Sequence, residues 1–453
     1  MVDFSRCIMG SFNVCIPVCV KSTHNQGAAT RLFLRCAMPH KLAESRSPGS
    51  VDEKTRCEVA TYAWMQRNCP DVRIPYLYGF GLSDGTQFTH EKQLPLFAFL
   101  CRVVHRAFLR LRSPSTTTCS LYAPHPSGSR LSTSYMVLED VAFKDSQMLS
   151  NSWQTHRGDP MRRRNLYAGI ARIMLSLARV PQPRIGSFRF HDDGTVTLSN
   201  RPLTCAMMIL ENDGAPRAIP PGRTYATAAA YASELMALQD GRLATHPNAV
   251  FDAESCRAEM ACRVTFRAAA HHFIDAARCE GPFRLRMDDL HPSNIFVDDA
   301  WNVKSLVDLE WIAAQPADML AAPYWLTGCD PGELEGQALT RFDGVRREFM
   351  QVFEDEERRS RRGPGEEEAP LRDAIEEAWA RGATWFWLGL GSVNAMHAMW
   401  DTHVRPRFVP FMTMAEEKDL SRLWCCESEA FVDRKVADYE AYCTELKRKY
   451  DEK

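Results

Sequence analysis

Apolar and polar residues alternate with the period of a β-strand in the first part of the chain. Residues 1–40 contain two such runs around a turn at Met9-Gly10-Ser11-Phe12-Asn13, and a further run covers 30–37 (TRLFLRCA). Residues 51–67 change to helical spacing, with acids in the first turn. Residues 134–140 again predict a strand. The first third of the chain is therefore predicted to hold several strands and one helix.

Helical spacing dominates after residue 140. A hairpin with an Asp-Asp-Gly turn is predicted at 185–198. The other periodic segments are predicted helices, and they cover residues 164–180, 224–238, 252–279, 371–403 and 430–453. We predict an α+β fold with a smaller N-terminal part over residues 1–138 and a larger, mainly helical part over 139–453. The last segment, from about residue 330 to 453, is expected to be a helical extension.

Residues 283–311 change between apolar runs and polar turns over a short distance. Their sequence is FRLRMDDLHPSNIFVDDAWNVKSLVDLEW. The triplets IFV and SLV predict two strands of a hairpin, with Asp and Asn residues in the turn between them. This strand–turn–strand arrangement could bring Asp289, Asn294 and Asp308 to one edge of a small hairpin.

The residue types in this trio suit phosphoryl transfer. A carboxylate can orient an attacking hydroxyl group and take its proton, and magnesium prefers carboxylate and amide oxygens. The other interpretation is structural, because Asp and Asn also form turns and helix caps. The spacing of a base, an amide and a second carboxylate favours chemistry for the trio, whereas the acids of the hairpin turn itself are expected only to form that turn.

The motif D-L-H-P-S-N, followed by V-D-L-E, resembles the aminoglycoside phosphotransferase family of small-molecule kinases, most of all its fungal members. The resemblance covers roughly residues 8–330, with its specific part at 287–311. It implies a two-lobed, protein-kinase-like fold with an N-terminal antiparallel sheet plus a helix, and a larger, mainly helical C-terminal lobe. It also implies that Asp289 is the catalytic base, Asn294 a metal and phosphate ligand, and Asp308 the main magnesium ligand.

Nucleotide-binding roles are expected for five further residues, four of them in the N-terminal part. The turn at Gly10 and Ser11 could lay backbone N–H groups over phosphates, although a plain hairpin turn would have the same sequence. Arg35 stands where the kinase template has a phosphate-binding Lys, and Glu58 stands where a helix Glu pairs with that cation. The alternatives are that Arg35 is an exposed strand Arg and that Glu58 is a solvated helix Glu. An ion pair between Arg35 and Glu58 would favour the nucleotide-binding roles. The resemblance places Glu139 in the linker whose backbone binds adenine.

Composition limits the kinds of partner and the cellular compartment that we expect for the protein. The chain has 453 residues, 45% of them hydrophobic, and a net charge of -2, which gives no electrostatic case for nucleic acid or an anionic membrane. Its 16 cysteines form no C-x-x-C pair, so we expect reduced, mostly buried thiols in a cytoplasmic protein. Residues 382–400 carry no formal charge, but their polar residues favour a buried helix over a membrane span.

We therefore expect an ATP- and magnesium-dependent kinase that phosphorylates a hydroxyl group of a small molecule. Met287, where the family usually has His, and Arg35 in place of Lys motivate a second hypothesis, a catalytically weak, pseudokinase-like nucleotide-binding regulator. A protein kinase is a third, but Asp308-Leu309-Glu310 is not D-F-G and no A-P-E segment follows. A cationic acceptor would need acidic walls, for which Glu310 and Asp318 are the candidates by position.

Overall fold

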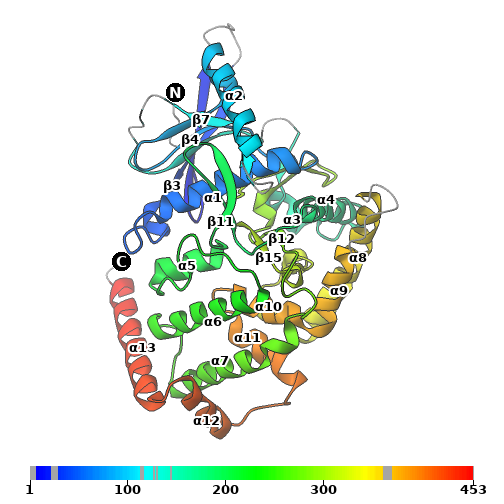
Figure 1. The fold of residues 1–453 in the computed structure, drawn as a ribbon. Coiled ribbons are helices and arrows are strands. Elements are labelled where there is room, and N and C mark those ends of the chain that lie inside the picture. Colours follow the sequence, from blue (N-terminus) through cyan, green and yellow to red (C-terminus); the bar gives the residue numbers. More distant parts are fainter. Residues whose placement is uncertain are drawn as a thin grey trace.

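The computed structural model describes residues 7–21, 29–112, 117–125, 128, 131–142, 145–360 and 370–451. In Figure 1 a β-sheet occupies the N-terminal end of the molecule, and the chain then continues into a larger part built mostly of helices. The structure thus combines an antiparallel sheet with many helices, and the predicted mixture of strands and helices is confirmed at this level.

The N-terminal part is built on a seven-stranded antiparallel sheet in the order β1-β2-β3-β8-β4-β5-β7. Its strands are β1 (Ile8–Met9), β2 (Asn13–Lys21), β3 (Ala29–Ala37), β4 (Leu77–Gly81), β5 (Gln87–His90), β7 (Tyr122–Pro124) and β8 (Tyr135–Glu139). β3 pairs with β2 on one side and with β8 on the other, so it lies inside the sheet. The strands predicted on both sides of the first turn, at 30–37 and at 134–140 are confirmed.

Helix α1 (Ser50–Asn68) lies between this sheet and a hairpin of β10 (Ser187–Phe190) and β11 (Thr195–Asn200), to which β6 (Thr118–Cys119) adds a third strand. On one side the Thr55 hydroxyl is 2.5 Å from that of Ser134, just before β8. On the other, the ring of Trp64 stacks on Phe188. Because it is covered on both sides, α1 is buried almost all round and carries no single apolar stripe.

The strands within residues 283–311 belong to two short sheets. In the first, β12 (Arg284–Met287) pairs with β15 (Ile312–Gln315). In the second, β13 (Ile295–Val297) pairs with β14 (Val303–Leu306) and with β9 (Gln147–Met148). The predicted hairpin is therefore confirmed, and the loop between β12 and β13 contains the first two members of the trio.

Helices account for most of the remaining described residues. They are α2 (Leu96–Arg112), α3 (Ser150–His156), α4 (Pro160–Ala178), α5 (Cys205–Asp213), α6 (Ala228–Thr245), α7 (Ala253–Phe273), α8 (Gly336–Ser360), α9 (Leu371–Arg381), α10 (Ala383–Gly391), α11 (Met396–Met399), α12 (Met414–Trp424) and α13 (Ser428–Asp451). α8 packs along α4, and α13 packs against α7 through a separate small core that includes Met260 and Phe431. The C-terminal third is therefore packed into the helical part.

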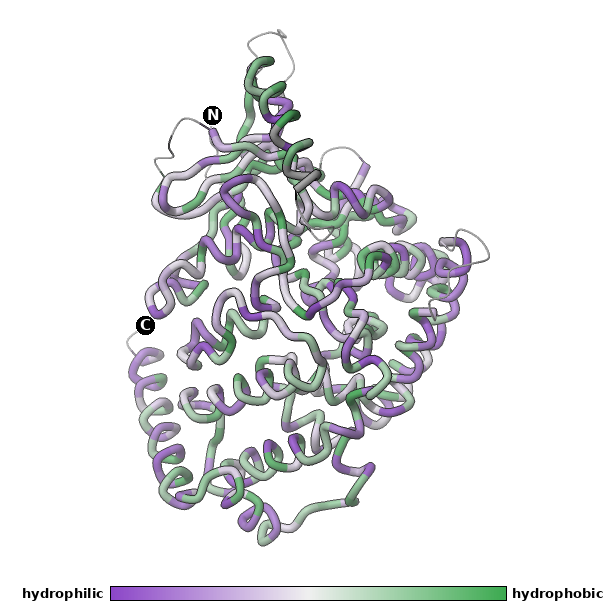
Figure 2. The backbone as a smooth tube through the Cα atoms, in the orientation of Figure 1, coloured by the Kyte–Doolittle hydropathy of each residue, from purple (hydrophilic) through white to green (hydrophobic). Residues whose placement is uncertain are grey.

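The structure differs from the prediction in several segments, and α3 and α5 are helices that were not predicted. The helix expected over 371–403 is broken, because Gly382 adopts a left-handed backbone (φ 75°) that ends α9 and starts α10. α7 ends at Phe273 rather than at Cys279. α2 was not predicted, and it presents the apolar side chains of Leu96, Phe97, Leu100 and Val104 to solvent. Figure 2 shows α2 as a largely hydrophobic helix at the sheet end of the molecule.

Two predictions from composition can be compared with the structure. Within the described ranges, no helix is both long enough and apolar enough to cross a bilayer. All 16 cysteines are free thiols, as expected, but only Cys36, Cys57, Cys69, Cys119, Cys256 and Cys262 are fully buried. Burial of the thiols is thus less general than predicted.

Candidate functional site

The loop between β12 and β13 brings Asp289 and Asn294 together. The Asp288 N–H donates to the Trp311 carbonyl oxygen at 2.9 Å, which ties the start of the loop to the segment before β15. Asn294 Nδ2 then donates to the Asp289 carbonyl oxygen at 2.9 Å and to its Oδ2 at 3.3 Å. The Asn294 amide therefore closes the loop and fixes the direction of the Asp289 carboxylate.

The environment of Asp289 disfavours its charged form. Burial raises the pKa of its carboxyl group to about 6, the nearby carboxylates of Asp308 and Asp288 add to this, and the Asn294 hydrogen bond acts against it. A carboxylate with a pKa near 6 is mostly ionised at neutral pH and is more basic than an ordinary Asp. Both properties suit a general base.

Asp308 lies next to Asn294, as the sequence predicted. It comes two residues after the end of β14, where the Val307 N–H donates to the Asn294 carbonyl oxygen at 2.9 Å. Its backbone is left-handed (φ 62°), an arrangement that costs a non-glycine residue about 1–3 kcal/mol and that is common at functional sites. Its side chain is 27% exposed. The backbone therefore brings Asp308 beside Asn294, and its charge acts on the Asp289 carboxyl group, while its side chain is directed to Arg35.

Arg35 joins the sheet to this edge. Its Nη2 lies 2.5 Å from Asp308 Oδ1 and 2.8 Å from Glu310 Oε2, and its Nη1 lies 3.5 Å from Glu58 Oε1. Arg35 is 7% exposed and Glu58 is 1% exposed. The interpretations as an exposed strand Arg and a solvated helix Glu are therefore wrong, and the Arg35–Glu58 pairing that was to decide between the alternatives is present.

Lys54 is a second buried cation at the site, and the sequence did not reveal it. Its ammonium group forms an ion pair with Glu310, lies 3.4 Å from Glu58 and donates to Asn13 Oδ1 at 2.7 Å. Asn13 in turn donates to Glu310 Oε2 at 2.8 Å. In the sequence, Lys54 and Glu58 are one ordinary i, i+4 pair of the kind found on solvated helix surfaces. Only the packing of α1 between two sheets makes the pair a buried one.

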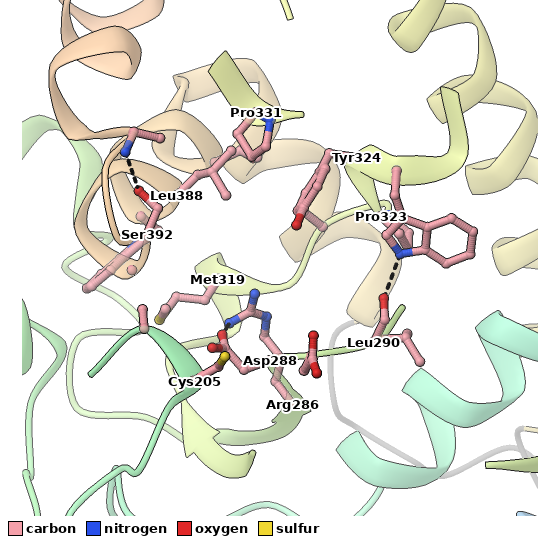
Figure 3. A pocket seen from close by; sticks show the side chains of 18 of the residues that line it. Cys205, Arg286, Asp288, Leu290, Met319, Pro323, Tyr324, Pro331, Leu388 and Ser392 are labelled. Carbon is pink, nitrogen blue, oxygen red and sulfur yellow. Dashed lines mark hydrogen bonds and ion pairs between the residues drawn. The ribbon is translucent and has the colours of Figure 1, made fainter. Parts of the chain in front are cut away.

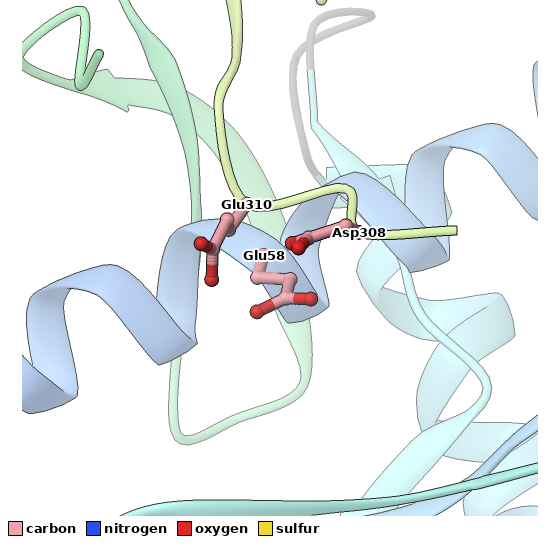
Figure 4. A group of neighbouring side chains, drawn as sticks. All are labelled: Glu58, Asp308 and Glu310. Carbon is pink, nitrogen blue, oxygen red and sulfur yellow. The ribbon is translucent and has the colours of Figure 1, made fainter. Parts of the chain in front are cut away.

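These groups form a charge cluster, which consists of Arg35, Lys54, Glu58, Asp308 and Glu310. Figure 4 shows its three carboxylates gathered beside α1, and oxygens of all three lie within 4.8 Å of one another. A group of this kind could hold a metal ion. However, both cations already donate into it, and the Glu58 and Glu310 side chains are only 2% exposed. Asp308 is thus the carboxylate of the cluster that is open to a ligand.

Three carboxyl groups in the charge cluster share two cations. Burial raises the pKa of Glu58 and that of Asp308, against the opposing effect of Arg35. Burial also acts on Glu310, but Lys54 and Arg35 together outweigh it and lower the pKa of its carboxyl group. Glu310 is therefore the firmly ionised centre of the cluster, and Asp308 has a charge that a bound cation could stabilise further.

The two backbone sites predicted for nucleotide are partly engaged within the protein. Gly10 lies in the exposed β1–β2 turn, and its N–H donates to the Asn13 carbonyl oxygen at 2.9 Å. The turn is anchored near the trio, because the ring of Phe12, which follows Ser11, packs on Trp311 with ring centroids 5.0 Å apart. The Glu139 N–H donates to the Tyr76 carbonyl oxygen at 2.9 Å. The nucleotide-binding roles of Gly10, Ser11 and Glu139 stay predictions.

A cavity of about 620 Å³ adjoins Asp289. Figure 3 shows it between Arg286 and Asp288 on one side and Pro331 and Leu388 on the other. Its walls come from α4, α5, the β12–β13 loop, the segment 319–325 and α10. The C-terminal third of the chain thus supplies a wall of the candidate site.

The acidic walls proposed from the sequence are wrong. Glu310 belongs to the charge cluster, and Asp318 is held by Arg278 at 3.4 Å and by Arg381 at 3.2 Å. Neither residue lines the cavity, whose acids beside Asp289 are Asp288 and Asp330. Sequence position alone could not separate a wall residue from one buried behind it.

Comparison with known proteins found no matching family model, no matching curated protein and no matching solved structure. The resemblance to aminoglycoside phosphotransferases rests on the motif at 287–311 itself.

Proposed function

We propose that the protein is an ATP- and magnesium-dependent kinase that phosphorylates a hydroxyl group of a small molecule. The observation that supports this best is the position of Asp289. It lines a cavity of about 620 Å³ and is also held by Asn294, which lies beside Asp308 and the charge cluster. A base between an acceptor cavity and a cation-binding edge is the arrangement that phosphoryl transfer requires.

The proposal includes the two-lobed, protein-kinase-like arrangement. The seven-stranded sheet with α1 would form the nucleotide lobe, over residues 1–138, and the helical part would form the acceptor lobe, over 139–453. Arg35 supports this division, because it extends from β3 to carboxylates that follow β14. Nucleotide would bind where the sheet meets the loop between β12 and β13.

The donor atoms fit magnesium and phosphate. The Asp308 carboxylate and the Asn294 amide oxygen would hold the metal, since magnesium binds hard oxygen ligands and keeps several waters. Arg35 would hold the phosphates with its planar guanidinium group. When bound, ATP would supply the phosphoryl group, and magnesium would supply positive charge that offsets the negative charge of the phosphates. Glu58 and Glu310 would keep the Arg35 guanidinium in place.

Asp289 performs the proton chemistry in this proposal. Its carboxylate orients a hydroxyl group in the cavity and accepts the hydroxyl proton as the oxygen attacks. Asn294 holds the carboxylate in that direction. The Trp325 Nε1–H donates to the Leu290 carbonyl oxygen at 2.6 Å, which fixes the residue after the base.

The substitution Asp289→Asn tests the proposal. It keeps the shape and one acceptor oxygen but removes the base, so phosphate transfer should fall about 10²- to 10⁴-fold while nucleotide binding is spared. Phosphate transfer is measured from radiolabelled ATP to an extract of small metabolites. Nucleotide binding is measured as a shift in melting temperature. Asp299→Asn, an exposed Asp in the hairpin turn, is the matched control. Unchanged transfer in Asp289→Asn would exclude the mechanism.

One observation favours the nucleotide-binding regulator as a second candidate. Asp308 Oδ1 lies 2.5 Å from Arg35, so a metal ion must compete with the guanidinium group for this carboxylate. Met287, in place of the usual His, is buried beside the base. A regulator would show a nucleotide-dependent melting shift without transfer to any acceptor. A kinase would show both.

A further inference from the structure

Two oppositely charged residues in the wall of the cavity beside Asp289 are paired with one another. Arg286 Nη1 donates to Asp288 Oδ1 at 2.8 Å and to Gln315 Oε1 at 2.8 Å, so these two charged wall residues neutralise one another. Asp330 is exposed to solvent. Apart from the base, the wall therefore offers no pair of buried carboxylates that would bind a polycation.

Most of the wall is apolar or aromatic. Met319 and Tyr324 come from the segment after β15, and Trp387 and Leu388 come from α10. A volume of about 620 Å³ lies in the range of roughly 300–1,000 Å³ that holds drug-sized ligands. Moving several ammonium groups from water to such a wall would be unfavourable, whereas a ring system would gain from the contact.

We infer that the acceptor is an uncharged, mostly apolar ring compound that carries an alcohol or phenol group. This inference rests on the proposed kinase function for the transfer step but not for binding. In the transfer, the acceptor oxygen forms a bond to the γ-phosphorus of ATP and the bond from that phosphorus to the β,γ-bridging oxygen breaks. The hydroxyl proton passes to Asp289, and ADP leaves.

Binding without nucleotide tests the inference directly. The probes are naringenin, 17β-estradiol and 2-naphthol, set against kanamycin and choline, and the readouts are tryptophan fluorescence and calorimetry on the full chain. We expect saturable binding of at least one ring compound, at least tenfold tighter than that of either cation. Leu388→Asp should weaken this binding tenfold or more. Leu423→Asp, on an exposed position of α12, should leave it unchanged.

The outcomes that overturn the inference are distinct from those that overturn the kinase. Tighter binding of kanamycin or choline overturns it, and so does the absence of saturable binding by every ring compound. If Leu388→Asp melts well below the wild type, Leu388→Asn takes its place, and unchanged binding in that variant also overturns the inference. Binding of a ring compound without phosphate incorporation from ATP and magnesium would support the ligand class and reject the kinase reaction.

Discussion

At the scale of single residues, Asp289 couples function to stability. Its pKa is raised to about 6 in the folded protein, against about 3.9 in an unfolded chain, so the folded state holds the proton more tightly. As a result, the free energy of unfolding falls as the pH rises from about 4 to about 6, and above that range this contribution no longer changes. Ionised Asp289 therefore destabilises the fold at neutral pH.

Asp289→Asn should consequently be more stable than the wild type, although it removes the proposed base. Above pH 6 the gain should be about 1–3 kcal/mol, because the amide is never charged, and at pH 4 it should disappear. Melting temperatures measured from pH 4 to pH 8 check this. Asp299→Asn, which is exposed, should show no such pH-dependent gain. A gain of equal size at pH 4 and pH 8 would contradict the assigned burial.

Lys54 belongs to the same scale, because removing one buried charge leaves another without a partner. Lys54→Met should cost about 3–5 kcal/mol of unfolding free energy, because it removes one of the two cations that pair with the buried Glu310 among the described residues. Adding Glu310→Gln should recover a large part of the loss, which a double-mutant cycle measured by urea unfolding would show. Lys418→Met, on the surface, should change stability little. Additive losses would mean that the two residues do not interact.

The trio and Lys54 differ in how far the sequence could reveal them. Asp289 and Asn294 are five residues apart in one loop, and a two-strand hairpin leads on to Asp308, so local structure was enough to bring them together. Lys54 and Asn13 reach Glu310 across about 250–300 residues of chain. No periodicity connects such positions, because the contact depends on how α1 packs between the sheet and the hairpin.

At the scale of elements, periodicity predicted many of the strands and longer helices, whereas it did not predict α2 or the breaks within helical segments. The break between α9 and α10 depends on the left-handed conformation of Gly382, which is selected when α10 turns to form the cavity wall. The sequence around a glycine in an apolar segment does not show which backbone conformation that glycine adopts. For the same reason, the uncharged segment 382–400 could be predicted as buried but not as broken.

A pair of glycine substitutions tests this distinction. Gly382→Ala should destabilise the protein by about 1–2 kcal/mol, because alanine disfavours φ 75° and its Cβ would meet the Arg407 guanidinium at 2.6 Å. Gly344→Ala lies within α8 with open space around it, so it should stabilise by about 0.5–1 kcal/mol. Melting temperatures of the two variants should move in opposite directions. A shift of the same sign in both would contradict the assigned backbone conformations.

At the scale of the whole molecule, the candidate site joins segments from most of the chain. β3 and α1 supply the cations, the β12–β15 region supplies the acids, and α10 supplies a cavity wall. Ligand bound at this junction would contact both the sheet and the helical part. Its binding free energy should therefore stabilise the molecule as a unit.

Nucleotide should accordingly raise the melting temperature in a magnesium-dependent way. At 100 times its dissociation constant, a ligand specific for the folded state adds about 2.7 kcal/mol. For a chain of 453 residues this raises the melting temperature by about 3 °C. We expect this shift with ATP and magnesium and a smaller one with ATP and EDTA. Asp308→Asn should make the two conditions equal, because it removes the least buried carboxylate of the charge cluster, while Asp299→Asn should preserve the difference. If Asp308→Asn retains the full magnesium dependence, the metal is held elsewhere, and the division of roles between Asp308 and the buried Glu58 and Glu310 is wrong.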